Sequence, residues 1–496
     1  MSARGAENGA QKSALERFLT LFTDVRAGEG LLTLLMAFNV FLLLTSYYLI
    51  RPVREALILS SGGAEAKSYL AAGMAVLLFF LVGGYAKLVS RYERTRLITV
   101  VTGIFIGCLV VFWAVGRAGV PYLGYAFFLW VGIFSVMVVA QFWSYANDVY
   151  TNDSGKRLFP LIAFGGSLGA FVGSWIADRM LDYFSVMEMM LWAAALLICC
   201  LALTNVISRK VWGKQAMESR QRELTARVQA RRQSPERSEE KESLGFDLLF
   251  RHRYVGFIAL LVLLLNLVNT NGEYILGSLA VNHSITRTEE AVELALATSA
   301  PLAFGSQELG DPSDRRNQEQ YRSSVIASFY AGFLTWMNLL GMALQLFVVG
   351  RLVKYGGVRA GLLWLPVIAL GTYALVFFLP LLRYVRIGKT FENASDYSIN
   401  KTTLQMLFLP TSHDIKYKAK QVVDSFFQRI GDVFSAAVVF LGTVIFTFGP
   451  RGFAALNLAF ILVWLGLVLL IVREHRAIEA GQRPEITGDV KASVPA

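Results

Sequence analysis

The sequence predicts an all-α integral membrane protein with about twelve transmembrane helices arranged in two six-helix bundles. Of its 496 residues, 55% are hydrophobic and only 17% are charged, whereas soluble domains carry roughly 25% charged residues. The mean hydropathy is +0.50. The three cysteines and four histidines show no spacing typical of a disulfide framework or a metal site. The composition therefore excludes a disordered chain and a disulfide-stapled secreted domain, and we expect no metal or other cofactor.

The apolar stretches fall into two groups of six, separated by a charged segment. A helix needs about 20 apolar residues to cross the hydrocarbon core of a bilayer. We expect spans at residues 31–50, 69–88, 97–115, 122–145, 158–177 and 184–207, and again at 255–271, 324–349, 358–379, 384–408, 422–448 and 453–472. This layout is typical of major-facilitator-type transporters, in which two bundles surround a site near the middle of the membrane.

The same pattern predicts how the chain is divided. We expect an N-terminal segment at 1–29, a six-helix bundle at 30–207, a charged linker at 208–250, a second bundle at 251–472 and a tail at 473–496. The second bundle contains an external insert at 272–322, in which residues 286–300 have the composition of a helix. The insert is either a lid over the external mouth or an insertion without a function.

Basic residues predict the orientation of the chain. The formal net charge is +11, and Lys and Arg gather in the loops on one side of the predicted spans. They are Lys87, Arg91, Arg94, Arg96, Lys156, Arg157, Arg351, Lys354, Arg359, Lys416, Lys418 and Lys420. Basic loops favour the cytoplasmic side, so we expect both termini in the cytoplasm and no nucleic-acid partner. The N-terminal segment resembles neither a signal nor a transit peptide, which favours a bacterial cytoplasmic membrane.

The tenth predicted span carries ionisable residues where lipid would penalise them. Lys389, Glu392, Asp396, Asn400 and Thr403 are spaced by three or four residues and so share one helical face, with Lys401 at its edge. Charged groups within a membrane helix usually face a cavity, water or a partner. This face either lines a substrate cavity or packs inside the bundle with ion pairs such as Lys389–Glu392.

Other spans contribute further candidate binding residues. Arg51 and Arg54 lie one turn apart at the end of the first span, and their guanidinium groups suit phosphate or carboxylate, although they could instead reach lipid headgroups. The fourth span ends with a face that includes Tyr145 and Asp148, and the seventh offers Asn269 and Glu273.

The eleventh span has charges near its cytoplasmic end. We interpret Asp424, Arg429 and Asp432 as a gate or structural latch, in which Arg429 pairs with one of the two aspartates. In the fifth span, Gly165, Gly169 and Gly173 recur every four residues. This pattern predicts close helix packing and not a phosphate-binding loop.

Three blocks of sequence resemble the nucleotide transporter (ATP/ADP translocase) family of plastids and intracellular bacteria. The first runs from Tyr48 to Leu57 and includes Arg51-Pro52-Val53-Arg54-Glu55. The second comprises Phe142-Trp143-Ser144-Tyr145-Ala146-Asn147-Asp148, Lys156-Arg157-Leu158-Phe159-Pro160-Leu161 and Gly165-Gly166-Ser167. The third comprises Phe408-Leu409-Pro410, Lys416-Tyr417-Lys418-Ala419-Lys420, Asp424, Arg429 and Gly431.

The resemblance implies exchange of ATP for ADP, or related nucleotide traffic, by alternating access. It places the family's basic residue of the first span at Arg54, and it groups Lys156, Arg157 and Lys418 with the gate or structural residues. The chain also departs from the family pattern. Val131 stands where the fourth span usually has Glu, Asn269 and Glu273 stand near a Glu and Lys of the seventh span, and Leu404-Gln405 replaces a Lys-Glu pair of the tenth. The chain is therefore a divergent relative.

The sequence supports a leading hypothesis and three alternatives. The first is a secondary transporter, not an enzyme, for an anionic small molecule such as a nucleotide or another phosphorylated metabolite. The second is a proton-coupled carrier of a different solute on the same fold, and the third is a membrane sensor or scaffold that moves no solute. An integral-membrane enzyme is the weakest, because no nucleophile lies beside a base. The sequence leaves the oligomeric state open and is compatible with a monomer.

Overall fold

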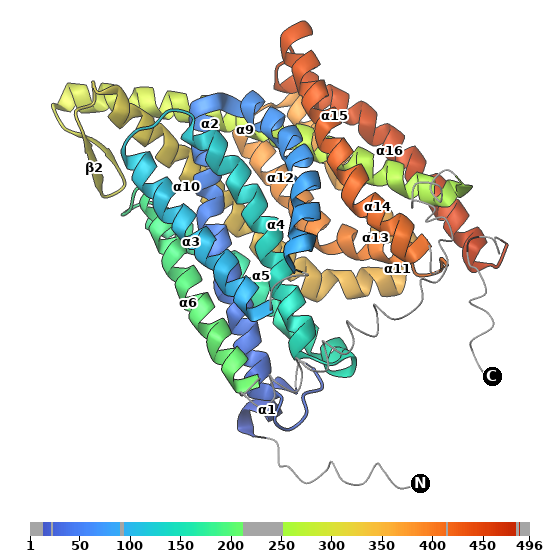
Figure 1. Ribbon diagram of the computed structural model, residues 1–496. Coiled ribbons are helices and arrows are strands. Elements are labelled where there is room, and N and C mark those ends of the chain that lie inside the picture. The colour runs from blue at the N-terminus through green and yellow to red at the C-terminus, as the bar shows by residue number, and fades with distance from the viewer. Residues whose placement is uncertain are drawn as a thin grey trace. The chain divides into compact units, whose positions relative to one another are not determined.

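The computed structural model describes residues 13–20, 23–89, 94–211, 251–412, 415–482 and 486. Nearly all of the described chain is helical, apart from one two-stranded hairpin (Figure 1). Nine helical stretches of this part of the chain are long and apolar enough to cross a membrane. The prediction of an all-α integral membrane protein is therefore confirmed.

The chain forms two compact units, which are described separately. The N-terminal unit takes Met1–Arg54 and Val82–Ser238, and the C-terminal unit takes Glu55–Leu81 and Glu239–Ala496. The first boundary falls inside helix α2 (Gly30–Val89), whereas the sequence assigned all of 30–207 to a single bundle. The middle of α2 thus belongs with the second half of the chain.

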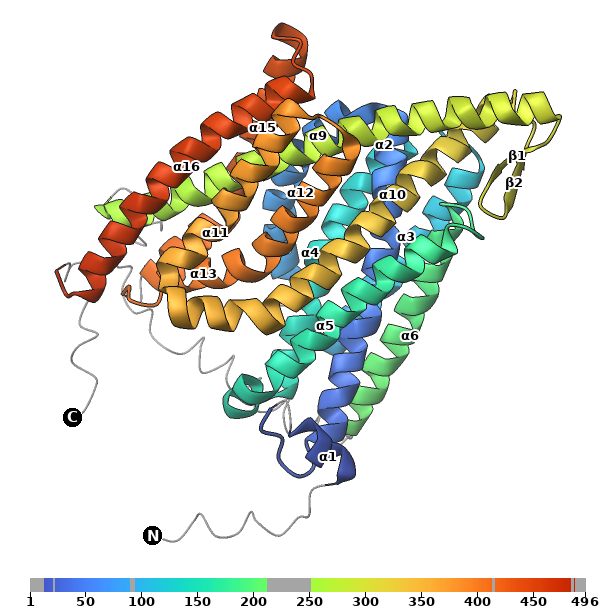
Figure 2. The same cartoon turned by 180° about the vertical axis from the view of Figure 1, so that it is seen from behind.

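The N-terminal unit is built from helices that run alongside one another in both views (Figures 1 and 2). Besides the start of α2, it contains α1 (Ala14–Leu19), α3 (Arg94–Arg117), α4 (Leu123–Val149), α5 (Asn152–Met180) and α6 (Glu188–Val211). Helix α3 packs against both α4 and α6. The described segments agree with the predicted third to sixth spans, because these are uninterrupted apolar runs bounded by polar residues.

The glycine stripe of α5 packs directly on the backbone of α2. A Cβ atom at Gly165 would lie 2.5 Å from the carbonyl oxygen of Ala37, and one at Gly173 would lie 2.6 Å from that of Thr45. At Gly169 a Cβ would collide with the carbonyl oxygen of Phe41. Only glycine permits this approach, and the predicted close packing is confirmed.

Helix α2 contains two spans joined by a sharp reversal. Its 60 residues would extend about 90 Å as a straight helix, far more than the roughly 30 Å of bilayer hydrocarbon. Gly63 has φ 72° and ψ −173°, which interrupts the helical geometry. The first segment therefore continues two turns beyond Arg54, whereas the sequence predicted that it ends near residue 50. Residues 55–61 contain no helix breaker, so the helix continues until Gly62-Gly63.

The C-terminal unit is organised around α9 (Arg253–Thr298), which packs against α10, α12, α15 and α16. Helix α10 (Arg315–Ala343) passes through the π-helical segment η1 (Leu344–Val349) into α11 (Gly350–Phe378). The tenth span comprises α12 (Leu382–Ser395), η2 (Asp396–Asn400) and α13 (Lys401–Leu407). The last two comprise η3 (Ile415–Ala419), α14 (Lys420–Val422), η4 (Val423–Phe427), α15 (Gln428–Phe440), η5 (Leu441–Ile445) and α16 (Pro450–Glu479).

The segment predicted as an external insert is mostly an extension of α9. The sequence predicted a helix at 286–300 within an insert at 272–322, and α9 continues unbroken to Thr298. A short antiparallel hairpin, β1 (Leu302–Phe304) and β2 (Gln307–Gly310), then leads into α10 (Figure 2). The helix predicted at 286–300 is confirmed over residues 286–298, but it is continuous with α9, because hydropathy marks only where apolar residues end. It does not mark where the helix ends, and residues 272–298 contain no proline.

Candidate functional site

A cluster of buried charged side chains lies inside the C-terminal unit, where α2, α9, α11 and α12 meet. Its centre is Lys389 of α12, whose side chain is 0% exposed. The Lys389 ammonium donates to Asn269 Oδ1 at 2.7 Å, to Glu392 Oε1 at 3.0 Å and to the Asn269 carbonyl oxygen at 3.4 Å. A lysine ammonium has three protons to donate. Lys389 is therefore fully hydrogen-bonded by this unit, and any ligand must compete for it.

Glu273 of α9 joins Lys389 to a second lysine. Its Oε2 lies 3.5 Å from the ammonium of Lys67, and its Oε1 lies 3.9 Å from that of Lys389. Asn393 donates to Glu273 Oε1 at 3.0 Å. Lys67 in turn forms its shortest ion pair with Glu55, at 2.7 Å. The result is a continuous chain of alternating charges, Glu55–Lys67–Glu273–Lys389–Glu392.

The backbone explains why these groups meet. The reversal at Gly63 returns α2 on itself, so that Lys67 lies beside Glu55 although twelve positions separate them. On α9, Asn269 and Glu273 are four residues apart and share a face. On α12, Lys389 and Glu392 are three residues apart. Tyr373 of α11 completes the enclosure, because its hydroxyl donates to Glu392 Oε1 at 3.4 Å.

The remainder of the tenth-span stripe continues beyond this cluster. Asn400 and Thr403 are buried, and Asn400 Nδ2 donates to Asp396 Oδ1 at 2.7 Å. Asp396 is half-buried and Lys401 is exposed. The π-helical segment η2 begins at Asp396, and such segments shift the helical register and occur often at functional sites. Beyond the enclosed ion pair, Asp396 and Lys401 are thus the more accessible members of the predicted stripe, whereas Asn400 and Thr403 are buried.

Arg51 and Arg54 lie on α2 in the N-terminal unit, before the interruption of this helix at Gly63. Both side chains are half-buried. The Arg51 guanidinium lies 5.4 Å from the ring centre of Tyr48 and donates to its hydroxyl at 3.3 Å. The Arg54 guanidinium lies 5.1 Å from the ring centre of Phe128. These cation–π contacts orient two guanidinium groups one helical turn apart.

Tyr145 has a structural environment within the N-terminal unit. It is 1% exposed, its hydroxyl lies 2.9 Å from the Ser208 hydroxyl, and it donates to the Thr204 carbonyl oxygen at 3.5 Å. These contacts connect α4 to α6, so the predicted role of Tyr145 in binding has no support from its position. Asp148, one turn further along α4, is half-buried.

The neighbouring residues Lys156 and Arg157 have different surroundings. Arg157 forms a bidentate ion pair with Glu29, with distances of 2.9 and 3.1 Å, and donates to the Asp24 carbonyl oxygen. Burial alone would raise the pKa of the Glu29 carboxyl. Its hydrogen bonds with the Arg157 guanidinium and the Arg26 backbone N–H, together with the charges of both arginines, outweigh burial and lower the pKa. This contact fastens the segment before α2 to the start of α5, as a structural latch requires.

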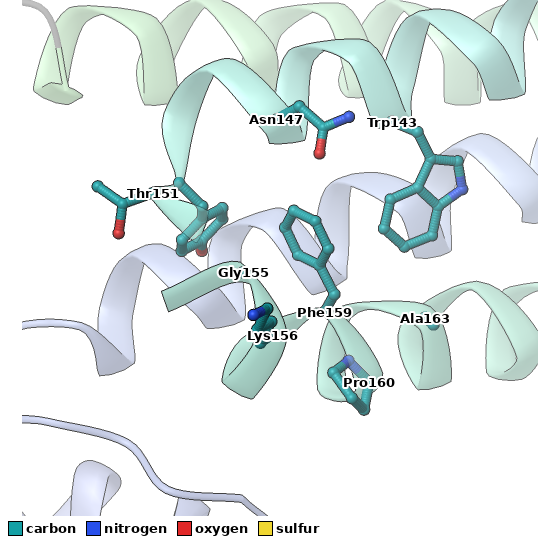
Figure 3. A pocket seen from close by; sticks show the side chains of 9 residues that line it. Trp143, Asn147, Thr151, Gly155, Lys156, Phe159, Pro160 and Ala163 are labelled. Carbon is teal, nitrogen blue, oxygen red and sulfur yellow. The ribbon is translucent and has the colours of Figure 1, made fainter. Parts of the chain in front are cut away.

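Lys156 instead lines a cavity of about 850 Å³ at the junction of α4 and α5 (Figure 3). Asn147 and Thr151 add polar atoms to its wall. The rings of Trp143 and Phe159 meet edge to face at this wall, with centroids 5.6 Å apart. The motif that carries the family resemblance thus forms a cavity lined by aromatic groups and one lysine.

The charges of the eleventh span connect neighbouring segments of the C-terminal unit. Asp432 accepts from Asn266 at 2.8 Å and lies 3.5 Å from Arg429, so the expected pairing of Arg429 is with Asp432. Asp424 pairs with Lys420 at 3.1 Å. The contact with Asn266 joins α15 to α9, as a latch would. The side chain of Lys418 lies outside the described part of the structure.

The structure therefore brings four of the predicted binding residues together: Asn269, Glu273, Lys389 and Glu392. It adds Glu55, Lys67, Tyr373 and Asn393, which the sequence analysis did not select. Lys67 was missed because it precedes the predicted second span at 69–88 and resembled a loop residue. Two features of the sequence could have indicated this ion pair. Lys67 lies only a few residues from an apolar run, and Glu55 lies at the end of the preceding span.

Comparisons with known proteins agree with this architecture. The family model described as TLC ATP/ADP transporter matches residues 9–116 and 124–273, which is more than half of the chain. The chain is 21% identical over 493 residues to ADP,ATP carrier protein 1 of Rickettsia bellii, covering 89% of this chain and 93% of that protein. It is also 21% identical over 394 residues to ADP,ATP carrier protein 1 of Chlamydia trachomatis, covering 71% of this chain but only 65% of that protein.

Solved structures show the same fold at low sequence identity. The nucleoside transporter NupG superposes with a TM-score of 0.57 at 10% identity, covering 89% of this chain and 98% of that one. The peptide transporter POT superposes with a TM-score of 0.56 at 13% identity, covering 96% and 100%. The major-facilitator-type fold that the sequence predicted is thereby confirmed. With the family model matched over both segments, the chain belongs to the TLC ATP/ADP transporter family.

Proposed function

We propose that this protein is a secondary transporter that exchanges nucleotides of the ATP/ADP type, or a related phosphorylated anionic metabolite, by alternating access. Membership of the family and the major-facilitator-type fold support this proposal. In such folds, two bundles expose one binding site to either side of the membrane in turn.

The observation that carries the proposal is the pair of guanidinium groups on α2. Arg51 and Arg54 lie within a membrane-spanning helix, and aromatic rings hold both side chains. A guanidinium group offers a planar set of donors that matches phosphate oxygens. Two such groups one turn apart suit a substrate that carries more than one phosphate.

The C-terminal unit offers a second group of cations, Lys67 and Lys389. Both are paired with carboxylates, so each can receive a phosphate oxygen only when a carboxylate moves away. This arrangement favours a site whose internal ion pairs change partners when substrate enters, which is how binding energy can shift a conformational equilibrium.

We further propose that the protein resides in a bacterial cytoplasmic membrane with both termini in the cytoplasm. The clustering of basic residues in loops on one side of the predicted spans supports this orientation. Reporter fusions at each terminus, one active only in the cytoplasm and one only outside it, test the prediction. Activity of the external reporter at either terminus would contradict it.

The alternative on the same fold is a proton-coupled carrier of another solute. The number of carboxylates in the buried cluster favours it, because among the described residues Glu55, Glu273 and Glu392 form ion pairs with Lys67 and Lys389. The two functions differ in their substrate, so binding assays separate them. Nucleotides should raise the Tm of the purified protein under the leading proposal and leave it unchanged under the alternative.

Exchange in proteoliposomes tests the proposal directly. Labelled ATP is added outside vesicles that contain ADP, inorganic phosphate or buffer alone, and we expect uptake to be fastest with internal ADP. Arg54→Ala should lower exchange roughly tenfold to a hundredfold, because a hydrogen bond to a charged group contributes about 1.5–3 kcal/mol. Uptake that is indifferent to both internal ADP and Arg54→Ala would refute the proposal.

Arg117 provides the matched control. It lies at the end of α3 in the same unit, and its guanidinium group lies 5.6 Å from the ring centre of Trp113. Arg117→Ala removes the same charge and the same kind of aromatic contact, and should leave exchange within about twofold of the wild-type rate, since an exposed charge contributes little. An equal loss in both variants would assign the effect of Arg54 to folding.

A further inference from the structure

Within the charged cluster, Glu273 is held less tightly than the other carboxylates. Its ion pairs with Lys67 and Lys389 measure 3.5 and 3.9 Å. The same two lysines lie 2.7 Å from Glu55 and 3.0 Å from Glu392. Both lysines thus have a closer carboxylate, and Glu273 lies between them as a third anion.

Glu273 is also more exposed than the two lysines that it contacts. Its side chain is 24% exposed, compared with 12% for Lys67 and 0% for Lys389. A tetrahedral oxyanion in the place of Glu273 would be attracted by the same two ammonium groups that Glu273 now contacts.

We infer that Glu273 occupies an anion subsite made by Lys67 and Lys389, and that a phosphate-like oxyanion binds there by displacing Glu273. The inference rests on the proposed function only in taking this subsite to receive a phosphate group of the transported substrate. The subsite itself follows from the distances and exposure of these three side chains.

Displacement of Glu273 has a consequence for protons. Once it leaves the two lysines, its carboxylate has lost the cations that lie within 4.0 Å of it in the described structure, and an unpaired charge in a membrane helix is costly. A proton taken from water removes this cost and leaves a neutral carboxyl group, with Asn393 still beside it. The oxyanion and one proton therefore bind together.

The groups that surround Glu273 come from α2, α10, α11 and α12. Glu55 and Lys67 lie on α2, Tyr373 on α11, and Lys389 with Glu392 on α12. The Lys67 ammonium also lies 5.4 Å from the ring centre of Tyr330 on α10. From α9, Tyr274 points elsewhere and donates to Glu65 at 2.8 Å. Glu65 has no ion pair with either lysine among the described residues, which makes it a suitable control.

Sulfate binding tests the inference without any transport step. Sulfate is tetrahedral and stays doubly charged between pH 6 and pH 8, so its own titration does not disturb the result. We would measure its Kd for the full-length purified protein by calorimetry at constant ionic strength, with chloride as the balancing anion. For the wild type we expect binding roughly tenfold to a hundredfold weaker at pH 8 than at pH 6, because one proton bound with the anion changes the affinity by up to about tenfold per pH unit.

Glu273→Gln removes the competing charge and keeps an acceptor for Asn393. We expect this variant to bind sulfate about tenfold more tightly than the wild type at pH 8, with no difference between pH 6 and pH 8. Glu65→Gln removes one carboxylate from the same unit and should behave as the wild type. The Tm of each variant without sulfate verifies that it is folded, and Glu273→Asp, which keeps the charge, should retain the pH dependence.

Several results would overturn the inference. They are sulfate binding by Glu273→Gln that is no tighter than that of the wild type, an equal gain in Glu65→Gln, or wild-type binding that does not vary with pH. These outcomes are independent of nucleotide selectivity. If sulfate behaves as expected but ADP does not stimulate ATP uptake, the subsite stands and the proposed substrate fails.

Discussion

Replacement of Lys389 tests whether the buried cluster is held together by charge. Lys389→Met removes the ammonium but keeps an unbranched side chain of similar length. It leaves Glu392 with a single described donor, the Tyr373 hydroxyl at 3.4 Å, and deprives Glu273 of one of its two cations. Breaking a buried ion pair from one side costs about 3–5 kcal/mol. For a unit of this size we expect a fall in Tm of roughly 10 °C.

A second substitution separates charge from packing. Glu392→Gln keeps an oxygen acceptor for Lys389 and Tyr373 and leaves Glu273 as a counter-ion of Lys389. It should cost less than about 1 kcal/mol as a single change, because the hydrogen bonds are preserved and no buried charge is left uncompensated. In the Lys389→Met/Glu392→Gln variant, the excess of carboxylates over lysines in the cluster is the same as in the wild type. The Tm of this double variant should therefore lie close to that of the wild type. Such non-additivity is the signature of directly interacting groups.

Thermal unfolding of the detergent-solubilised protein, followed by tryptophan fluorescence, measures all four proteins of this cycle. Lys420→Met is the control, because Lys420 pairs with Asp424 at 3.1 Å but both side chains are partly exposed. Such pairs contribute at most about 1 kcal/mol. A Lys389→Met variant as stable as Lys420→Met, or a double variant no more stable than Lys389→Met, would refute the argument from charge.

Two further predictions concern the N-terminal unit. Gly169→Ala should lower the Tm, because its Cβ would collide with the backbone of α2 and overpacking costs about 1–3 kcal/mol. The control is Gly107→Ala in α3, which should leave the Tm unchanged or raise it, because no atom lies within 4 Å of its Cβ. A larger fall in Tm for Gly107→Ala than for Gly169→Ala would contradict the close approach of α2 and α5. The pKa of Glu29 is lower in the folded protein than its ordinary value of 4.5. Its ion pair with Arg157 therefore stabilises the fold above pH 4.5, and this stabilisation is lost as the pH falls through the lowered pKa. Glu29→Gln should therefore lower the Tm at pH 7 but make little difference at pH 3, and an equal effect at both values would show that the ion pair does not stabilise the latch.

Much of the architecture was predictable because bilayer physics acts on local sequence. Apolar runs of sufficient length revealed the helices from α3 to α6, and the spacing of Gly165, Gly169 and Gly173 revealed a close helix contact. The spacing of Lys389 and Glu392 likewise predicted their ion pair. In each case the signal lies within one helix, where the geometry of a single turn decides which side chains are neighbours.

Contacts between segments that are distant in sequence were not predictable in this way. Neither the joining of Lys67 to Glu55 nor the position of Glu273 between two lysines has a local signature, because both depend on the reversal at Gly63 and on how α9 and α12 pack. Hydropathy also placed the end of the first span too early and did not show that α9 is continuous. Apolar composition indicates which residues can lie in the hydrocarbon core, and a helix can extend beyond them. The amino-acid sequence thus specified a helical membrane protein and its ionisable residues. Tertiary packing determined which of these charges compensate one another, because the partner of a buried charge is set by proximity in space.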